Sequence, residues 1–188
     1  MTGKGRSDRR HSAFSIPHSA FAYQIAIANE QRVLKADRRR LRRVAERTLA
    51  VEEVREAEIS VALVDNARIH EINRQFLGHD YPTDVISFLL ECDSAFLPLA
   101  KGGSAREPRG SGKSLSGEII ISAEMAAQTA SRYQWNPHDE LLLYLVHGLL
   151  HLCSYDDLSA AEQRIMRTRE TEILALWNLV PHYVERPV

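Results

Sequence analysis

Two histidines and one aspartate in the C-terminal part of the chain have the types and spacing that suit a metal ion. In the segment HGLLHLCSYDD, His147 and His151 lie four residues apart, and Asp157 follows six residues later. On a helix, residues four apart share one face at about 6 Å between Cβ atoms, so both imidazoles can bind one ion. Zinc binds imidazole nitrogen at about 2.0–2.1 Å and also accepts carboxylate oxygen. The pattern predicts a three-ligand site, with Asp156 as a rival to Asp157 for the third position.

The alternative is that both histidines are ordinary polar residues on an apolar helix. The surrounding segment LLLYLVHGLLHL has almost no other polar group, and burying a polar side chain without a partner costs about 1–3 kcal/mol. A metal ion would satisfy both imidazoles. A peptidase of the HExxH class is disfavoured, because Gly148 stands where the general-base glutamate of that motif would be.

Length and composition place the chain among soluble globular proteins. It has 188 residues, of which 44% are apolar and 26% charged, enough for one domain with a core but not for two. No apolar run is long enough to span a membrane, and residues 1–20 lack the pattern of a secretory signal. Two cysteines, Cys92 and Cys153, cannot form a disulfide framework, which fits a reducing compartment. We therefore expect a cytoplasmic protein.

The net charge of −1 hides a cluster of basic residues. Between positions 32 and 47, acidic Asp37 and Glu46 stand against Arg32, Lys35, Arg38, Arg39, Arg40, Arg42, Arg43 and Arg47. One interpretation is a solvated helix face; the other is a patch that contacts phosphate groups, with Arg39, Arg40 and Arg43 as substrate-binding candidates.

Hydrophobic periodicity and capping residues predict four short strands among five helices. The strands are expected at 22–29, 58–64, 85–90 and 117–122. Helices are expected after the capping residues Asp37, Asp65 and Ser122, after the break at Asn136-Pro137, and after the capping box at Ser159–Glu162. The helix after Asp65 should direct Ile69, Ile72 and Phe76 inward. The fold class is α/β (α+β), with a small mixed sheet.

The predicted organisation is one metal-dependent hydrolase domain over residues 21–180. Residues 1–20 are polar, basic and aperiodic, and are expected to be a disordered tail. Residues 93–116 hold most of the Gly, Pro and Ser in the middle of the chain and are expected to form a flexible insertion between two strands.

Three segments together resemble one known family. HGLLHLCSYDD resembles the HGxLHLxGYDH signature of the YbeY family, the metal-dependent endoribonucleases and rRNA maturation factors of bacteria. The segment NRQFLGHDYPTDVISF, residues 73–88, resembles the family stretch that ends in TDVLSF, and GEIIIS, residues 117–122, resembles its LGDIVIS strand. The three motifs occur in family order, and the likeness spans roughly residues 22–178.

The resemblance implies one Zn²⁺ per chain, held by His147, His151 and Asp157. It also implies cleavage of single-stranded RNA, maturation of the 3′ end of 16S rRNA, and a part in ribosome quality control. The implied partners are single-stranded rRNA and the small ribosomal subunit, with a ribosomal protein or a GTPase as further candidates and no membrane. Two histidines with one carboxylate also suit Fe²⁺ or Mn²⁺, which stay open as alternatives.

Three positions depart from the family pattern. Asp157 replaces the usual histidine, which adds negative charge at the ligand set. Leu77 stands where the family has an arginine thought to assist with substrate phosphate; Arg74 or the basic helix around 39–43 is the expected replacement. Ser154 replaces a glycine, which costs about 1 kcal/mol if the position has positive φ.

His79 and Ser87 are further substrate-binding candidates in the resembling stretch, as a loop histidine and a strand residue in the cleft wall. Two other function classes stay open. One is a ribosome-associated binding factor with weakened or lost catalysis, and the other is a metal hydrolase that acts on a small phosphate ester or amide.

Overall fold

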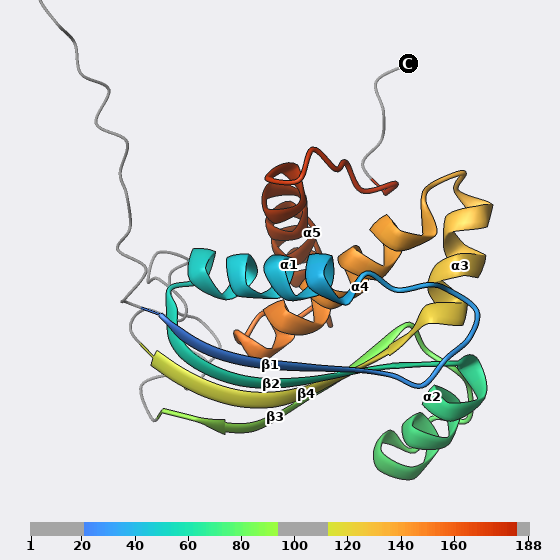
Figure 1. Ribbon diagram of the computed structural model, residues 1–188, viewed down its shortest axis with the longest axis horizontal. Helices are drawn as coiled ribbons and strands as arrows, with labels where there is room; N and C mark the ends of the chain where they lie inside the picture. Colours follow the sequence, from blue (N-terminus) through green and yellow to red (C-terminus); the bar gives the residue numbers. More distant parts are fainter. Residues whose placement is uncertain (1–20, 94–112, 184–188) are drawn as a thin grey trace, which may run out of the picture.

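A computed structural model of the chain describes residues 21–93 and 113–183, and Figure 1 shows their arrangement. The elements in chain order are β1 (Ala22–Asn29), α1 (Arg38–Val51), β2 (Val54–Val64), α2 (Asn66–Ile72), the π-helical turn η2 (Asn73–Leu77), β3 (Val85–Cys92), β4 (Lys113–Ser122), α3 (Ala123–Arg132), α4 (Pro137–Leu152) and α5 (Ala160–Ala175). The predicted tail at 1–20 lies outside the described residues.

The four strands form one mixed sheet in the order β1-β2-β4-β3. β1 and β4 both pair in parallel with β2, and β3 pairs antiparallel with β4. Parallel neighbours need crossover connections, which α1 supplies between β1 and β2. The predicted mixed four-stranded sheet with five helices is confirmed.

The helices cover the two faces of this sheet unequally. In Figure 1, α1, α4 and α5 lie over one face, and α2 lies against the other. The main core forms between the sheet and the larger helical layer, while a small second cluster joins Ile69 of α2 to Val64, Ile86 and Ile120 of the sheet. Side chains on the α4 face and on the α2 face are therefore separated by the sheet.

Helix α4 is buried on nearly every side. Eleven of its sixteen residues are buried, from Glu140 to Leu152, so its sequence is apolar without a polar stripe. Gly148 explains how closely α4 approaches the sheet, since a Cβ at this position would lie 2.9 Å from Ile119 Cγ2 and 3.1 Å from Val85 Cγ2. Val85 belongs to β3 and Ile119 to β4, so α4 approaches both strands closely at this glycine.

The predicted helix starts are confirmed by their caps. The side chains of Asp37, Asp65, Ser122 and Asn136 each accept a hydrogen bond from a backbone N–H in the first turn of the following helix. At the start of α5, Ser159 and Glu162 form the complete capping box, with bonds in both directions. These caps are local interactions, which is why sequence alone located them.

The structure corrects three predicted details. Phe76 does not face inward: it is 62% exposed and packs edge-on against Phe88 at 5.8 Å between ring centroids. The cause is the change to π-helical winding at Asn73, which rotates the following residues off the α-helical face. Strand β2 begins at Val54 rather than 58. Strand β4 begins at Lys113, so the last four residues of the predicted insertion belong to the sheet, and residues 94–112 lie outside the described residues.

Within residues 21–93 and 113–183, no helix combines the length and the apolar character needed to cross a membrane. Cys92 and Cys153 are both free thiols. Burial of Cys153 in the main core, beside the Glu52 carboxylate, raises the pKa of its thiol, so this cysteine packs as a small apolar residue.

The fit of α4 against the sheet predicts the effect of Gly148→Ala. The added methyl group would overpack the contact with Ile119 and Val85, which outweighs the gain in helix propensity, so the free energy of unfolding should fall by about 1–2 kcal/mol. Urea unfolding measures the change. Ser131→Ala on the exposed side of α3 is the control and should change stability by less than about 0.5 kcal/mol. Equal or greater stability of the Gly148 variant would contradict the close packing.

Candidate metal centre

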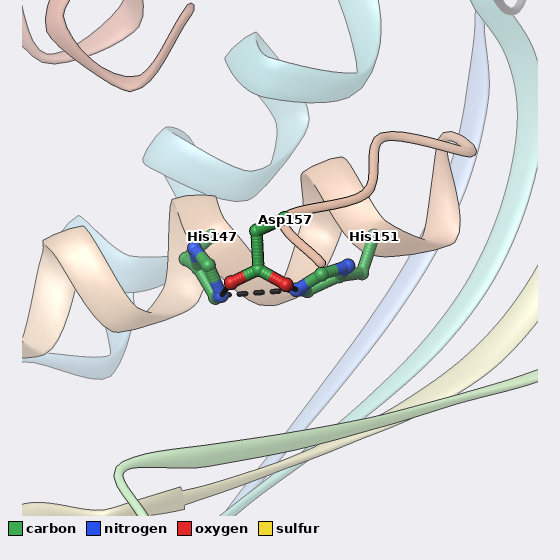
Figure 2. A group of neighbouring side chains, drawn as sticks. All are labelled: His147, His151 and Asp157. Carbon is green, nitrogen blue, oxygen red and sulfur yellow. Dashed lines mark hydrogen bonds and ion pairs between the residues drawn. The ribbon is translucent and has the colours of Figure 1, made fainter. Parts of the chain in front are cut away.

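The structure brings three side chains from the predicted site together. His147 and His151 project from the same face of α4, and Asp157 returns from the segment after the helix to lie between them (Figure 2). One ligand atom from each residue lies within 4.8 Å of the others. The two Nε2 atoms are 3.0 Å apart, and the Asp157 carboxylate oxygens lie 3.9 Å from His147 Nε2 and 4.0 Å from His151 Nε2.

Hydrogen bonds on the far side of each ring aim the Nε2 atoms at one point. His147 Nδ1 lies 2.6 Å from a carboxylate oxygen of Glu170, and His151 Nδ1 lies 3.1 Å from the backbone oxygen of Tyr155. Both partners are acceptors, so both Nδ1 atoms carry the proton and both Nε2 atoms present lone pairs.

Two lone pairs at 3.0 Å repel unless a cation or a proton lies with them. Two imidazole nitrogens bound to one tetrahedral zinc are about 3.3 Å apart, given a Zn–N distance of about 2.0–2.1 Å. The geometry of the three side chains therefore fits a divalent metal ion.

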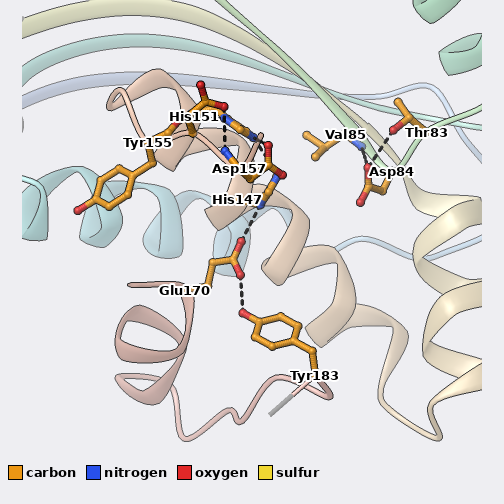
Figure 3. A network of polar contacts seen from close by, with 10 residues as sticks. Thr83, Asp84, Val85, His147, His151, Tyr155, Asp157, Glu170 and Tyr183 are labelled. Carbon is orange, nitrogen blue, oxygen red and sulfur yellow. Dashed lines mark hydrogen bonds and ion pairs between the residues drawn. The ribbon is translucent and has the colours of Figure 1, made fainter. Parts of the chain in front are cut away.

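The carboxylate of Glu170 supports His147 from the interior. Its side chain is 4% exposed and also accepts a short hydrogen bond from the Tyr183 hydroxyl, which completes a chain from Tyr183 through Glu170 to His147 (Figure 3). Burial, followed by the charge of Glu170, raises the pKa of Tyr183, so this hydroxyl stays protonated and donates. A carboxylate behind a ligating histidine fixes the ring and raises its basicity, which is the usual arrangement in metal sites.

The two histidines differ in their protonation. Burial lowers the pKa of His147, but the hydrogen bond to Glu170 and the Glu170 charge outweigh burial, and the net pKa is raised. Burial and the neighbouring charge of His147 lower the pKa of His151. A metal ion must displace the proton that His147 takes up, so metal binding and proton binding compete at this ring.

Asp157 reaches the histidines because α4 ends in a tight reversal. The N–H of Tyr155 donates to the Leu150 oxygen and the N–H of Ser154 donates to the His151 oxygen, the pair of bonds that defines a Schellman motif. Ser154 occupies the left-handed position of this motif with φ of 68°, where glycine is the usual residue. Asp156, the rival ligand, instead accepts a hydrogen bond from the N–H of Asp157.

A cavity of about 510 Å³ opens beside the histidine pair. Besides His147, Asp157 and Glu170, its walls come from the segment before β3, from α3 and α4, from α5, and from the segment after α5: Pro82, Thr83, Asp84, Met125, Thr129, Arg132, Tyr133, Glu140, Leu143, Tyr144, Gln163, Met166, Arg167, His182 and Tyr183. The Asp84 carboxylate accepts hydrogen bonds from the Val85 N–H and the Thr83 hydroxyl, so Asp84 shapes the start of β3 and also forms part of the cavity wall.

Arg74 and His79 lie away from this cavity wall. Arg74 is exposed on η2 and lies 4.0 Å from an oxygen of Asp80. His79 is exposed and stacks on Tyr81 at 5.4 Å between ring centroids. Neither residue is among the residues that line the cavity, and α2, which leads into η2, packs on the opposite face of the sheet from α4.

Ser87 and the arginines of α1 lie nearer to α4. Ser87 follows Val85 by two residues in β3, so it shares the sheet face on which Val85 meets α4. Arg40 forms a 2.8 Å ion pair with Asp139 of α4. Arg39 is exposed, and Arg43 lines a separate hollow with Arg47 and Trp177. None of these four substrate-binding candidates lines the cavity of the metal ligands.

Comparisons with known proteins agree with this architecture. The profile of the Endoribonuclease YbeY family matches residues 26–178. The chain belongs to this family. It is 35% identical to Endoribonuclease YbeY of Syntrophus aciditrophicus over 84% of this chain and 91% of that one, and 38% identical to Endoribonuclease YbeY of Bacillus subtilis over 66% and 74%.

The fold also resembles that of a solved protein, TM1509 from Thermotoga maritima. The two share 25% sequence identity with a TM-score of 0.50, over 87% of this chain and 98% of the other. The structure shows where the three residues that depart from the YbeY family motifs lie. Asp157 lies between the histidines, Ser154 has positive φ, and Leu77 is 47% exposed at the end of η2, outside the cavity lining.

Sequence reasoning missed Glu170 and Tyr183. Glu170 lies on the inner face of α5 between Met166 and Ile173, both buried. An acidic residue in register with apolar residues at positions 166, 173 and 174 is a signal that could have identified it. Tyr183 gave no such signal, because it follows the last helix and meets Glu170 only in the folded chain.

The support that Glu170 gives His147 predicts the effect of Glu170→Gln. The amide keeps the shape but loses the charge that favours metal-bound imidazole, so zinc affinity should fall about 10- to 100-fold. Competition with a chromogenic chelator measures the dissociation constant. Glu172→Gln, an exposed position on the same helix, is the matched control and should leave affinity unchanged. An unaltered dissociation constant in the Glu170 variant would show that the contact does not act on the metal.

The left-handed backbone at Ser154 predicts that Ser154→Gly stabilises the protein. Removing the Cβ relieves strain of about 1–2 kcal/mol, and the greater freedom of glycine in the unfolded chain offsets part of this, which leaves a gain of about 0.5–1 kcal/mol. Thermal or urea unfolding measures it. Ser131→Gly inside α3 should have the opposite sign, because glycine weakens a right-handed helix. A loss of stability at both positions would refute the strain at Ser154.

Proposed function

We propose that this protein is a metal-dependent endoribonuclease that cleaves single-stranded RNA, with His147, His151 and Asp157 as the metal ligands. The observation that carries the proposal is the convergence of three ligand atoms within 4.8 Å beside an open cavity of about 510 Å³. Membership of the YbeY family supports the choice of RNA as substrate, since the curated relatives are named endoribonucleases.

Zn²⁺ is the proposed ion, one per chain, with Fe²⁺ or Mn²⁺ as alternatives that the ligand set also suits. When bound, such an ion supplies a Lewis acid for a phosphoryl oxygen and lowers the pKa of water. Residues of the chain hold and orient the groups that would bind this ion. Glu170 holds the His147 ring in place, the Tyr155 carbonyl holds the His151 ring, and Asp157 contributes a carboxylate from the reversed segment after α4.

The proposed substrate brings its own chemistry to this site. RNA carries a 2′-OH that can act as an internal nucleophile, and water is the other candidate nucleophile. The proposed biological substrate is the 3′ end of 16S rRNA, with the small ribosomal subunit as partner and a role in ribosome quality control in the cytoplasm. A ribosomal protein or GTPase is proposed as a further partner. Six further residues remain proposed contacts for the substrate: Arg74, Arg39, Arg40, Arg43, His79 and Ser87.

A second candidate function is a ribosome-associated binding factor with weak or lost catalysis. Two observations favour it. Leu77 is uncharged at the position of the family arginine, and Asp157 adds a carboxylate to a cavity that Asp84, Glu140 and Glu170 also line. Both changes make the site less attractive to an anionic substrate. A metal hydrolase acting on a small phosphate ester or amide is the remaining alternative.

Metal analysis and RNA cleavage of wild type and Asp157→Ala test the proposal. Wild type purified without added metal should hold about one zinc per chain and cut a labelled single-stranded RNA, and Asp157→Ala should lose both properties, because two ligands hold an ion far less tightly than three. Asp156→Ala is the matched control, since its carboxylate lies outside the ligand cluster.

Each contrary result has a distinct meaning. Full metal content in Asp157→Ala would show that the third ligand lies elsewhere. One zinc per chain with no RNA cleavage, together with ribosome co-sedimentation that survives His147→Ala, would replace the nuclease with the binding factor. Cleavage of a small phosphate ester but not of RNA would favour the small-substrate hydrolase.

A further inference from the structure

Two arginines that the family motifs do not include line the same cavity as His147 and Asp157. Arg132 is the last residue of α3, and Arg167 lies in the middle of α5. Helix α4, which carries His147, packs against both of these helices. The two arginines therefore belong to one cavity but come from different helices.

The charge of the cavity makes these two cations important. Four carboxylates line it, from Asp84, Glu140, Asp157 and Glu170. A phosphodiester backbone is an anion, and proteins bind it mainly by neutralising phosphates with Lys and Arg. Position 77, where the family has arginine, is Leu77 and does not line the cavity. Within the described residues, Arg132 and Arg167 are the arginines of the cavity wall.

Both guanidinium groups are available to a ligand. Arg132 and Arg167 are exposed, and neither takes part in an ion pair between described residues, in contrast to Arg40, Arg74 and Arg169. Arg167 instead lies over the ring of Tyr183, 5.4 Å from its centroid. This cation–π contact leaves the N–H groups of the guanidinium for hydrogen bonds. Through Tyr183 and Glu170, the position of Arg167 is tied to that of His147.

An aromatic ring completes this wall. Tyr133 directly follows Arg132, stacks on His182 with ring centroids 4.2 Å apart, and remains 52% exposed. Sites for single-stranded nucleic acid combine cationic groups that follow the backbone with aromatic rings on which bases stack. The combination of Arg132, Tyr133 and Arg167 therefore suits a nucleotide better than an isolated small anion.

We propose that Arg132 and Arg167 bind the backbone phosphates of RNA nucleotides next to the bond that is cut, and so offset the carboxylates that line the cavity. This inference rests on the proposed function. Bidentate contacts from guanidinium to phosphate would hold the strand in the cavity that His147 also lines. Arg132 and Arg167 act here as substrate-binding residues, and metal binding does not depend on them.

Equilibrium binding of RNA to the variants Arg132→Gln, Arg167→Gln and the double variant tests this proposal. The probe is a short, fluorescein-labelled, 2′-O-methylated single-stranded RNA, titrated by anisotropy against zinc-loaded protein over a series of salt concentrations. Each single variant should weaken binding about fivefold to tenfold and reduce the slope of log K against log salt by about 0.7, and the double variant should show about twice the reduction in slope.

Arg164→Gln is the matched control. Arg164 is exposed on the same helix α5 but lines a different hollow, with Tyr155, Ile165 and Arg169, so its removal should have a smaller effect on affinity and leave the slope nearly unchanged. Metal content and the thermal midpoint of every variant show whether fold and metal site are intact.

The outcomes separate this inference from the proposed function. If wild type cuts RNA but both arginine variants bind like Arg164→Gln, the inference is wrong and the nuclease stands. If the variants lose affinity as expected while wild type with full metal cuts no RNA, the phosphate contacts stand and the nuclease falls. Wild type that binds no RNA would overturn both.

Discussion

The site depends on a helix that is buried on nearly every side and still carries two imidazoles. Helix α4 presses Gly148 against β3 and β4 and turns its remaining apolar residues into the core. Most of this helix is buried, and the two imidazoles are only 23% and 27% exposed, so an inner ring nitrogen without a partner would be costly. His147 and His151 are each held from behind by an acceptor, which forces both Nε2 lone pairs towards the same point. The need to satisfy buried polar groups and the ability to bind a metal thus have one structural origin.

Acceptors behind the rings also determine how the two ligands differ. Glu170 places a full negative charge behind His147, whereas His151 has only the dipole of the Tyr155 carbonyl. Burial lowers the pKa of both rings, but at His147 the hydrogen bond and charge of Glu170 outweigh it and the pKa is raised, whereas burial and the charge of His147 leave the pKa of His151 lowered. Since Tyr183 donates to Glu170, the segment after α5 helps to position His147 although it lies far from the signature motif in sequence.

Carboxylates outnumber arginines in the cavity beside the two histidines. Asp84, Glu140, Asp157 and Glu170 all line it and shift it towards negative potential. Cations from other elements can restore the balance, and the positions of Arg132 and Arg167 in the cavity wall suit that role. The departures at positions 77 and 157 therefore need not mean loss of function, since charge at a site is a sum over all elements that line it.

The sequence by itself determined what depends on neighbours along the chain. Helix starts followed from single capping side chains such as Asp37 and Ser122, the strands from alternation, and the pairing of His147 with His151 from the 3.6-residue helical repeat. Two features of these elements could not be predicted from the sequence. The π-helical turn after Ile72 moved Phe76 to the surface, and the extent of β2 and β4 depended on strand partners rather than on composition.

Only the tertiary structure decided which distant residues meet. The hydrogen bonds from Tyr183 to Glu170 and between Glu170 and His147 join α4, α5 and the segment after α5, and no spacing in the sequence encodes them. The same holds for Arg132 and Arg167, which look like ordinary surface residues until α3 and α5 are packed on either side of α4. The physical reason is that a repeat or a cap acts over a few residues of one element, whereas the charge and shape of a cavity are set by how several separate elements pack against one another.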